Sequence, residues 1–348
     1  MSRTIGHHAW ALPLAAGLLL AGCSDGTSSD DAADAARELD ASVFDYDAAA
    51  APELNESFRV DLSYHDLQAR AISFDSPAGG QVTGYIAYPD DADPDAAMIT
   101  MHGMPGDATG NLDVLDIFAC SGAIAVAIDA PFARDDEAKA DPNRPDGPDP
   151  WPLTFTEIDR DEQIQLVQDL RRTVDVLESL GAEHITVDAI SWSADPVMVL
   201  AGVEPRVDGF AVLVGSLVVD RFLLDGKPVY PLGNLEDDDA DAWLAAMESV
   251  SPLRWAQYAT APVLFQSNTG DVVSTRESAE RLHEATGSDV EVVWHEGAPG
   301  SDGHDITPAV AQRHVRWQAE ILGLDPARVD ACLKPMLAEV RQALQGQQ

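Results

Sequence analysis

Short apolar runs alternate with longer amphipathic segments along most of the chain after Phe58. The short runs are typical of buried strands, and the longer segments repeat their apolar residues at the helical period, most clearly from Phe155 to Leu180. This alternation predicts an α/β fold, in which helices cover both faces of a mostly parallel sheet. The predicted strands are residues 70–75, 81–88, 97–102, 123–129, 185–190, 207–214, 262–266 and 290–294, and shorter helices are expected near residues 112–120, 197–202 and 275–285 and along the C-terminus.

Two long stretches interrupt this rhythm within a folded domain that we expect to span residues 57–348. Residues 132–153 are rich in proline and acidic side chains, and residues 217–258 contain one predicted helix, near Asp238 to Glu248. Loops of this length are usually functional or disordered. Both follow strands whose carboxyl ends share one edge of the sheet, so we expect both inserts over the active site and the second to form a small lid.

The first 22 residues have the features of an export signal. Arg3 gives a positive start, and the apolar run from Ala9 to Ala21 is too short for a bilayer core of roughly 30 Å, which needs about 20 residues. The run ends in Leu20-Ala21-Gly22-Cys23, which resembles the lipobox of bacterial lipoproteins. The resemblance implies cleavage before Cys23, a lipid on its thiol, and anchoring to a membrane at the periplasmic face or cell surface of a bacterium. A plain secretory signal cut after Cys23 is the alternative.

The next segment, residues 23–56, is rich in Ala, Asp and Ser and holds few large apolar residues, Phe44 and Tyr46 among them. Such a composition cannot bury enough surface to fold alone, so we expect an acidic flexible tether. Two cysteines remain beyond it, Cys120 and Cys332. In an exported protein they could form a disulfide, and two buried free thiols are equally compatible with the sequence.

The balance of charge excludes one class of partner. Sixty Asp and Glu residues against 21 Lys and Arg give a formal net charge of −39, and this field repels phosphate backbones. We therefore expect no binding to nucleic acid. A hydrophobic fraction of 45% is normal for a packed soluble domain and excludes wholesale disorder.

Candidate chemistry follows the predicted strands, because reactive groups collect at the carboxyl ends of parallel strands. The stretch His102-Gly103-Met104-Pro105-Gly106 comes directly after one strand. Its glycines leave room for backbone N–H groups to approach an oxyanion that develops on a substrate. The backbone of this turn would do that work, so we expect His102 to be structural.

A second turn, Ala189-Ile190-Ser191-Trp192-Ser193, lies between a predicted strand and a helix and resembles the G-x-S-x-G nucleophile turn with both glycines replaced. If Ser191 is the nucleophile, the positions two residues away hold the small Ala189 and Ser193. If Ser193 is the nucleophile, one of these positions holds the bulky, charged Asp195. We therefore favour Ser191 and keep Ser193 as the alternative, and a plain helix N-cap as the structural interpretation. Because Ser193→Gly would restore the usual motif, the sequence predicts activity at or above wild type for that variant.

Two further strand ends carry Asp271 and His304. The chain order Ser, Asp, His, with each residue after its own strand, is the order of an α/β-hydrolase triad. His295 is an alternative to His304 as the base, and Asp220 is an alternative to Asp271 as the carboxylate that orients the base. The remaining candidates, His184 and His283, are expected at the surface.

From about Phe58 to Gly323 the chain resembles the α/β-hydrolases of the dienelactone-hydrolase and acetyl-xylan-esterase-like group. The resemblance implies that Ser191 attacks the substrate, that His304 is the base, and that Asp271 orients the base. It also implies an oxyanion hole made by the backbone N–H groups of two residues, Met104 and Trp192. Supporting stretches are Ser73-Phe74-Asp75-Ser76-Pro77-Ala78-Gly79-Gly80, Asp129-Ala130-Pro131-Phe132, Asp169-Leu170-Arg171-Arg172 and Val203-Glu204-Pro205-Arg206-Val207.

The function implied is a serine esterase that cleaves a small-molecule carboxylic ester through an acyl-enzyme. No cofactor is expected, because the sequence has no His/Cys/Asp cluster with zinc-like spacing and no Gly-rich phosphate loop after a strand. Two alternatives stay open: a non-catalytic binding protein on a decayed hydrolase fold, and a peptidase of the same fold.

Overall fold

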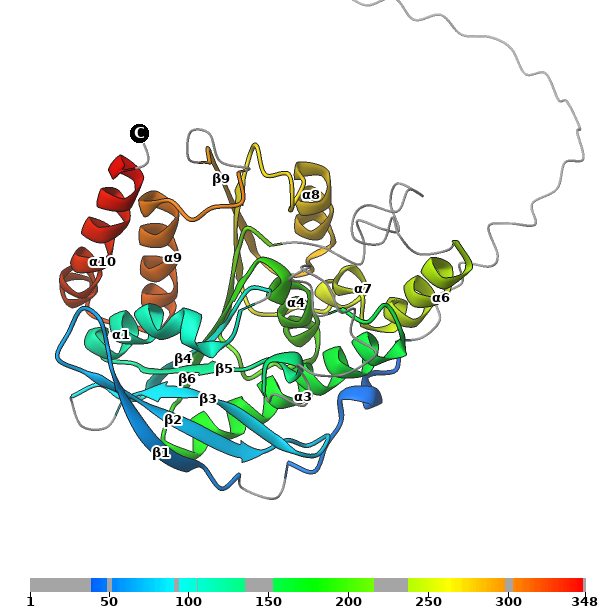
Figure 1. The fold of residues 1–348 in the computed structure, drawn as a ribbon, viewed down its shortest axis with the longest axis horizontal. Helices are drawn as coiled ribbons and strands as arrows, with labels where there is room; N and C mark the ends of the chain where they lie inside the picture. Colours follow the sequence, from blue (N-terminus) through cyan, green and yellow to red (C-terminus); the bar gives the residue numbers. More distant parts are fainter. Residues whose placement is uncertain are drawn as a thin grey trace, which may run out of the picture. The chain divides into compact units, whose positions relative to one another are not determined.

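A nine-stranded sheet forms the centre of the protein (Figure 1). The computed structural model describes residues 39–48, 52–90, 94–104, 106–134, 153–215, 237–297 and 303–346. The strand order is β1-β2-β3-β5-β4-β6-β7-β8-β9, and the first three strands are antiparallel while the other six run parallel to one another. The strands are β1 (Asn55–Asp61), β2 (Gln68–Asp75), β3 (Gln81–Ala87), β4 (Ala96–Met101), β5 (Ile124–Ile128), β6 (His184–Ile190), β7 (Gly209–Leu213), β8 (Val263–Asn268) and β9 (Val290–His295).

Helices cover both faces of this sheet, because its central strands are apolar on both sides. On one face α1, α9 and α10 share a core with alanines of β2 to β5. On the other face α3 packs against α4, and α4 packs against α7. The predicted α/β architecture is confirmed. The helices are α1 (Leu112–Ser121), α3 (Glu157–Ser179), α4 (Ala194–Val203), α6 (Asp237–Met247), α7 (Pro252–Ala256), α8 (Arg276–Ala285), α9 (Pro308–Ile321) and α10 (Pro326–Gly346).

The expected flexible tether is wrong for its final part. Phe44 lies in a short 3-10 helix, Ala41–Phe44, where it is fully buried with its ring centroid 5.2 Å from that of Trp255. The Tyr46 hydroxyl donates to Asp175 of α3 at 2.9 Å, and β1 already begins at Asn55. This segment is too short to fold alone, but two of its aromatic side chains dock it on α7 and α3. Residues 1–38, with the predicted signal and Cys23, lie outside the described part.

The second insert contains the predicted helix, now α6, and also α7, which the sequence did not reveal. Trp243 attaches α6 to the domain: its side chain is buried, and its indole N–H donates to the Asp159 carboxylate at 2.7 Å. Most of the first insert (residues 135–152) and the beginning of the second (residues 216–236) are outside the described residues.

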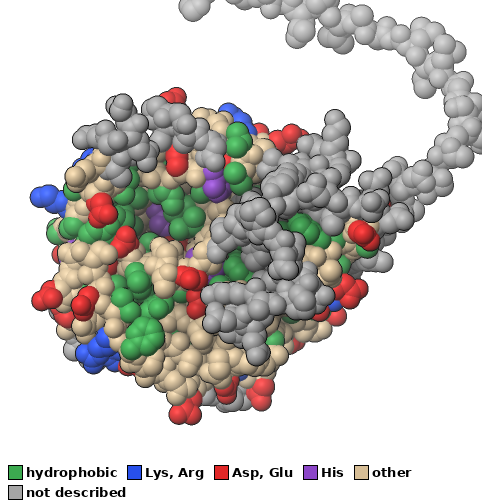
Figure 2. All heavy atoms as spheres, viewed as in Figure 1, with side chains coloured by type: hydrophobic (Ala, Val, Ile, Leu, Met, Phe, Trp, Pro, Cys, Tyr) green, Lys and Arg blue, Asp and Glu red, His purple; other side chains and the backbone are tan. Residues whose placement is uncertain are grey.

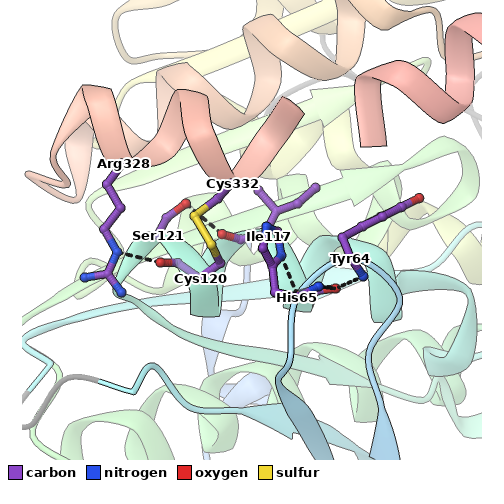
Figure 3. The surroundings of a disulfide bond; sticks show 8 residues. Tyr64, His65, Ile117, Cys120, Ser121, Arg328 and Cys332 are labelled. Atoms are coloured by element: carbon purple, nitrogen blue, oxygen red, sulfur yellow. Dashed lines mark hydrogen bonds and ion pairs between the residues drawn. A yellow bond between two sulfur atoms is a disulfide. The ribbon is translucent and has the colours of Figure 1, made fainter. Parts of the chain in front are cut away.

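A disulfide joins Cys120 of α1 to Cys332 of α10, and this settles the question left open by the sequence (Figure 3). His65 lies beside the two sulfurs, and its Nδ1 is 2.8 Å from Asp116. Within the described ranges this is also the one grouping of His, Cys or acidic side chains close enough to hold a metal, but its sulfurs are bonded to each other. No helix there has the length and apolar character of a membrane span.

Candidate active site

Ser191 occupies a strained turn between β6 and α4. Its backbone φ is +59°, in the left-handed region that side chains other than glycine rarely adopt. The turn tightens into the 3-10 helix Ser191–Ser193 and continues directly into α4. Strain of this kind is kept where the surrounding structure enforces it, and it is a mark of functional sites.

Ser193 has a different task in the same turn. Its side chain is fully buried, and its hydroxyl accepts the backbone N–H of Ile190 at 2.9 Å. The same hydroxyl lies 3.0 Å from the carbonyl of Ile190 and 3.4 Å from that of Met101 at the end of β4. Ser193 therefore closes the turn from within, and its hydroxyl is engaged there, which favours Ser191 as the nucleophile.

The structure brings together the three side chains expected from the sequence. Ser191 Oγ lies 2.8 Å from His304 Nε2, and His304 Nδ1 lies 2.8 Å from Asp271 Oδ2. The other oxygen of Asp271 accepts the backbone N–H groups of Val273 and Ser274, each at 2.8 Å. These bonds fix the carboxylate, so that it accepts Nδ1–H and leaves Nε2 to take the proton of the serine hydroxyl.

Two residues that the sequence did not reveal hold the His304 loop. The Asn268 side-chain amide at the end of β8 donates to the carbonyls of Gly303 and Asp305, on either side of His304, at 2.6 and 2.8 Å. Gly303 has a φ of +81°, and an added Cβ would lie 2.5–2.6 Å from the backbone of Gly270 and Asp271. Only glycine therefore lets this loop approach the Asp271 turn so closely.

The loop after β4 lies against the serine turn. A Cβ added to Gly103 would lie 3.5 Å from the Ser191 Cβ and 3.3 Å from the Ile190 carbonyl oxygen. His102 is buried, its Nδ1–H donates to the carbonyl of Gly103, and its Nε2 accepts the N–H of Ala130 at 3.1 Å. Burial lowers the pKa of His102, in keeping with this neutral form. His102 thus fixes the loop that carries Met104, as expected of a structural residue.

Neither alternative residue, His295 nor Asp220, takes the place of a triad member in the described structure. His295 Nε2 lies 3.0 Å from the Gln266 side chain, and Asp220 is outside the described residues. His184 is exposed, as expected. His283, expected at the surface, is partly buried: its ring centroid lies 4.4 Å from that of Phe265, and burial lowers its pKa to about 4.

A small cavity of about 20 Å³ lies beside the serine turn. Its walls include the rings of Phe132 and Trp192, which meet edge to face at 5.2 Å, and the side chains of Trp243 and Met247 from α6. The second insert therefore borders the carboxyl edge of the sheet next to Trp192. Its action as a lid, like an oxyanion hole at Met104 and Trp192, stays a prediction.

Acidic side chains are spread over the face seen in Figure 2, and histidine side chains show there among hydrophobic ones. The surplus of negative charge is thus not gathered into one acidic patch on this face.

No protein-family model matches the sequence, and a search of curated proteins finds no match. Solved structures match over most of the chain. An acetyl xylan esterase from Paenibacillus sp. R4 is 16% identical and aligns with a TM-score of 0.59, over 77% of this chain and 88% of its own. Acetyl xylan esterase 1 from Thermoanaerobacterium sp. JW/SL YS485 is 14% identical with a TM-score of 0.58, over 80% and 91%.

The chain has the α/β-hydrolase fold. The Pyrococcus horikoshii acylaminoacyl peptidase is also similar, with 14% identity and a TM-score of 0.51 over 74% of this chain and 41% of its own. Identities this low establish the α/β-hydrolase fold alone, since one fold serves many reactions. What the chain does must be argued from the site itself.

Proposed function

We propose that the protein is a serine hydrolase that cleaves carboxylic esters through an acyl-enzyme. One observation carries the proposal: Ser191, His304 and Asp271 are joined in this order by two hydrogen bonds, and the serine lies on a strained turn at the end of a central strand. A non-catalytic protein on a decayed hydrolase fold has no use for backbone strain and three aligned side chains at once. The decayed-fold alternative is therefore the weaker one.

In the first step the Ser191 oxygen attacks the ester carbonyl while its proton passes to His304 Nε2. The resulting imidazolium is stabilised by Asp271, whose carboxylate accepts Nδ1–H and two backbone N–H groups. When the tetrahedral intermediate collapses, the same proton goes from His304 to the departing alkoxide, which leaves as the alcohol. Ser191 then carries the acyl group as an ester.

In the second step water replaces the alcohol. His304 removes a proton from the water as it attacks the acyl-enzyme, and returns that proton to Ser191 Oγ when the carboxylic acid leaves. In both steps the oxyanion would be held by the N–H groups of Met104 and Trp192. Each donor of this kind contributes about 3–4 kcal/mol to the transition state.

An ester is the substrate we favour over a peptide. The esterase neighbours align along nearly their whole length, whereas the acylaminoacyl peptidase aligns over 41% of its chain. No metal or cofactor enters any step, because Ser191, His304 and Asp271 supply the nucleophile and the proton transfers.

The test is hydrolysis of p-nitrophenyl esters of increasing acyl length by the full chain, beside an acyl-amino-acid p-nitroanilide. We expect turnover of esters, with a burst of p-nitrophenol equal to the enzyme concentration if deacylation is the slower step. Preference for the anilide would favour the peptidase. Turnover of neither, together with saturable binding of an ester, would favour the binding protein.

We propose further that the mature protein is a lipoprotein anchored through Cys23. The lipobox-like Leu20-Ala21-Gly22-Cys23 supports this. In a bacterial host the wild type should partition into the detergent phase, while Cys23→Ala should lose that behaviour or fail to mature. Wild-type protein found wholly in the aqueous phase would contradict the anchor.

A further inference from the structure

Another histidine–carboxylate pair lies buried beneath the active site. His314 Nε2 of α9 is 2.9 Å from Asp188 Oδ2 of β6, and their side chains are 4% and 1% exposed. The two residues are near the reacting groups along the chain. Asp188 lies on β6, three residues before Ser191 in the turn that follows this strand, and α9 begins at Pro308, shortly after His304.

The pair joins β6, which leads into the Ser191 turn, to α9, which follows the His304 loop. Thr186, Asp188 and Ile190 alternate onto the face of β6 that meets α9, and the Thr186 hydroxyl donates to Gln318 at 3.0 Å. Thr307 caps α9 three residues after His304. A displacement of α9 along β6 would therefore be transmitted directly to the His304 loop.

Apolar contacts alone do not fix this register. Val310 packs against Leu213 and Val214, and Trp317 packs against Ala211 and Leu264. Such contacts are non-directional, so a small slide of the helix costs them little. A directional bond at 2.9 Å between Asp188 and His314 does resist that slide.

Stability does not account for the pair. Asp188 Oδ1 and His314 Nδ1 are buried and have no hydrogen-bond partner within the part of the chain that the structure describes. A half-satisfied buried pair is typically no more stable than apolar side chains of similar volume. A role in positioning explains why polar groups stand at this contact.

We propose that Asp188 and His314 are positioning residues, which hold α9 and the His304 loop in register with the nucleophile strand. The inference rests on the proposed function, since it concerns the alignment of His304 with Ser191. Misplacement of a catalytic group by about 1 Å can cost about 100-fold in rate. We expect about a tenfold loss when the bond is removed, because Asn268 still clamps the loop.

The test compares reaction rate with stability. The Gln318 amide also lies 3.4 Å from Asp188 Oδ2 and 3.0 Å from His314 Nε2, so replacing the pair leaves this buried amide with fewer partners. In Asp188→Val/His314→Leu we expect a chain that stays folded at the assay temperature, while kcat and the rate of fluorophosphonate labelling fall about tenfold at unchanged KM. Asp188→Asn keeps the acceptor and should stay within about twofold of wild type. Should the double variant fail to fold, Asp188→Asn/His314→Leu removes the bond without leaving a buried charge and should show the same loss of rate.

Thr186→Val is the matched control, because it breaks a bond between the same two elements two residues further from Ser191. Because the Asp188–His314 bond remains in this variant, it should label within about twofold of the wild-type rate. Wild-type labelling in both double variants, or a loss that merely follows the unfolded fraction, would overturn the positioning role. A wild-type chain that itself does not react with the probe would instead overturn the proposed function.

Discussion

Ser191 and Ser193 are two residues apart, yet their hydroxyls belong to different parts of the structure. That of Ser191 meets His304 Nε2 at 2.8 Å, and that of Ser193 is buried inside the turn against the N–H of Ile190. The strained backbone of Ser191 turns its side chain toward His304. The residue that fills the usual second glycine position is therefore part of the scaffold that maintains this strain.

The structure changes the expectation for Ser193. In Ser193→Ala and Ser193→Gly the buried N–H of Ile190 loses its acceptor, which should lower the free energy of unfolding by about 1–3 kcal/mol. Fluorophosphonate labelling should persist in both variants, because Ser191 and His304 remain. Denaturant unfolding beside labelling checks this. Full stability in Ser193→Gly would contradict the structural role of this hydroxyl.

Gly303→Ala should impair the base. Its Cβ would collide with the backbone of Gly270 and Asp271 at 2.5–2.6 Å, so the His304 loop must shift. We expect kcat/KM on a p-nitrophenyl ester to fall by about 10- to 100-fold. Gly270→Ala is the matched control, since nothing lies within 4 Å of its added Cβ. Equal activity in the two variants would count against the clamp on this loop.

His283 should make stability depend on pH. Burial lowers its folded pKa to about 4, against 6.5 for an exposed imidazole, so the unfolded chain binds the extra proton first as the pH falls. This stabilising contribution of about 2–3 kcal/mol is fully present above pH 6.5. It is lost progressively as the pH falls from 6.5 to about 4. Unfolding of His283→Phe should show a weaker pH dependence than wild type. An unchanged slope would contradict the assignment.

The disulfide should contribute to stability through α10. Cys120 and Cys332 are 212 residues apart, and α10 completes the core over α1. Reduction, or the double variant Cys120→Ser/Cys332→Ser, should lower the free energy of unfolding by about 2–4 kcal/mol while activity at low temperature persists. Reductant should have no further effect on the double variant. If reductant destabilises the double variant as much as it does the wild type, the effect lies elsewhere.

The sequence was informative where the chemistry is local. The apolar runs placed eight of the strands, and the small neighbours of Ser191 pointed to the serine that lies beside His304 before any distance was known. The clamp by Asn268 was not visible, because an asparagine at a strand end acquires its role only when a distant loop folds over it. The docking of Phe44 could not be predicted for the same reason, since its partner Trp255 lies in an insert with no readable motif. Burial of this kind depends on tertiary contacts rather than on composition.

The central claim is that Ser191 forms the covalent intermediate, and mass spectrometry of the labelled chain tests it most directly. After reaction with a fluorophosphonate, we expect one adduct per chain, on the peptide that carries Ser191, and none in Ser191→Ala. His304→Ala should react far more slowly, because no base then takes the proton. An adduct on Ser193, or undiminished labelling of Ser191→Ala, would contradict the account.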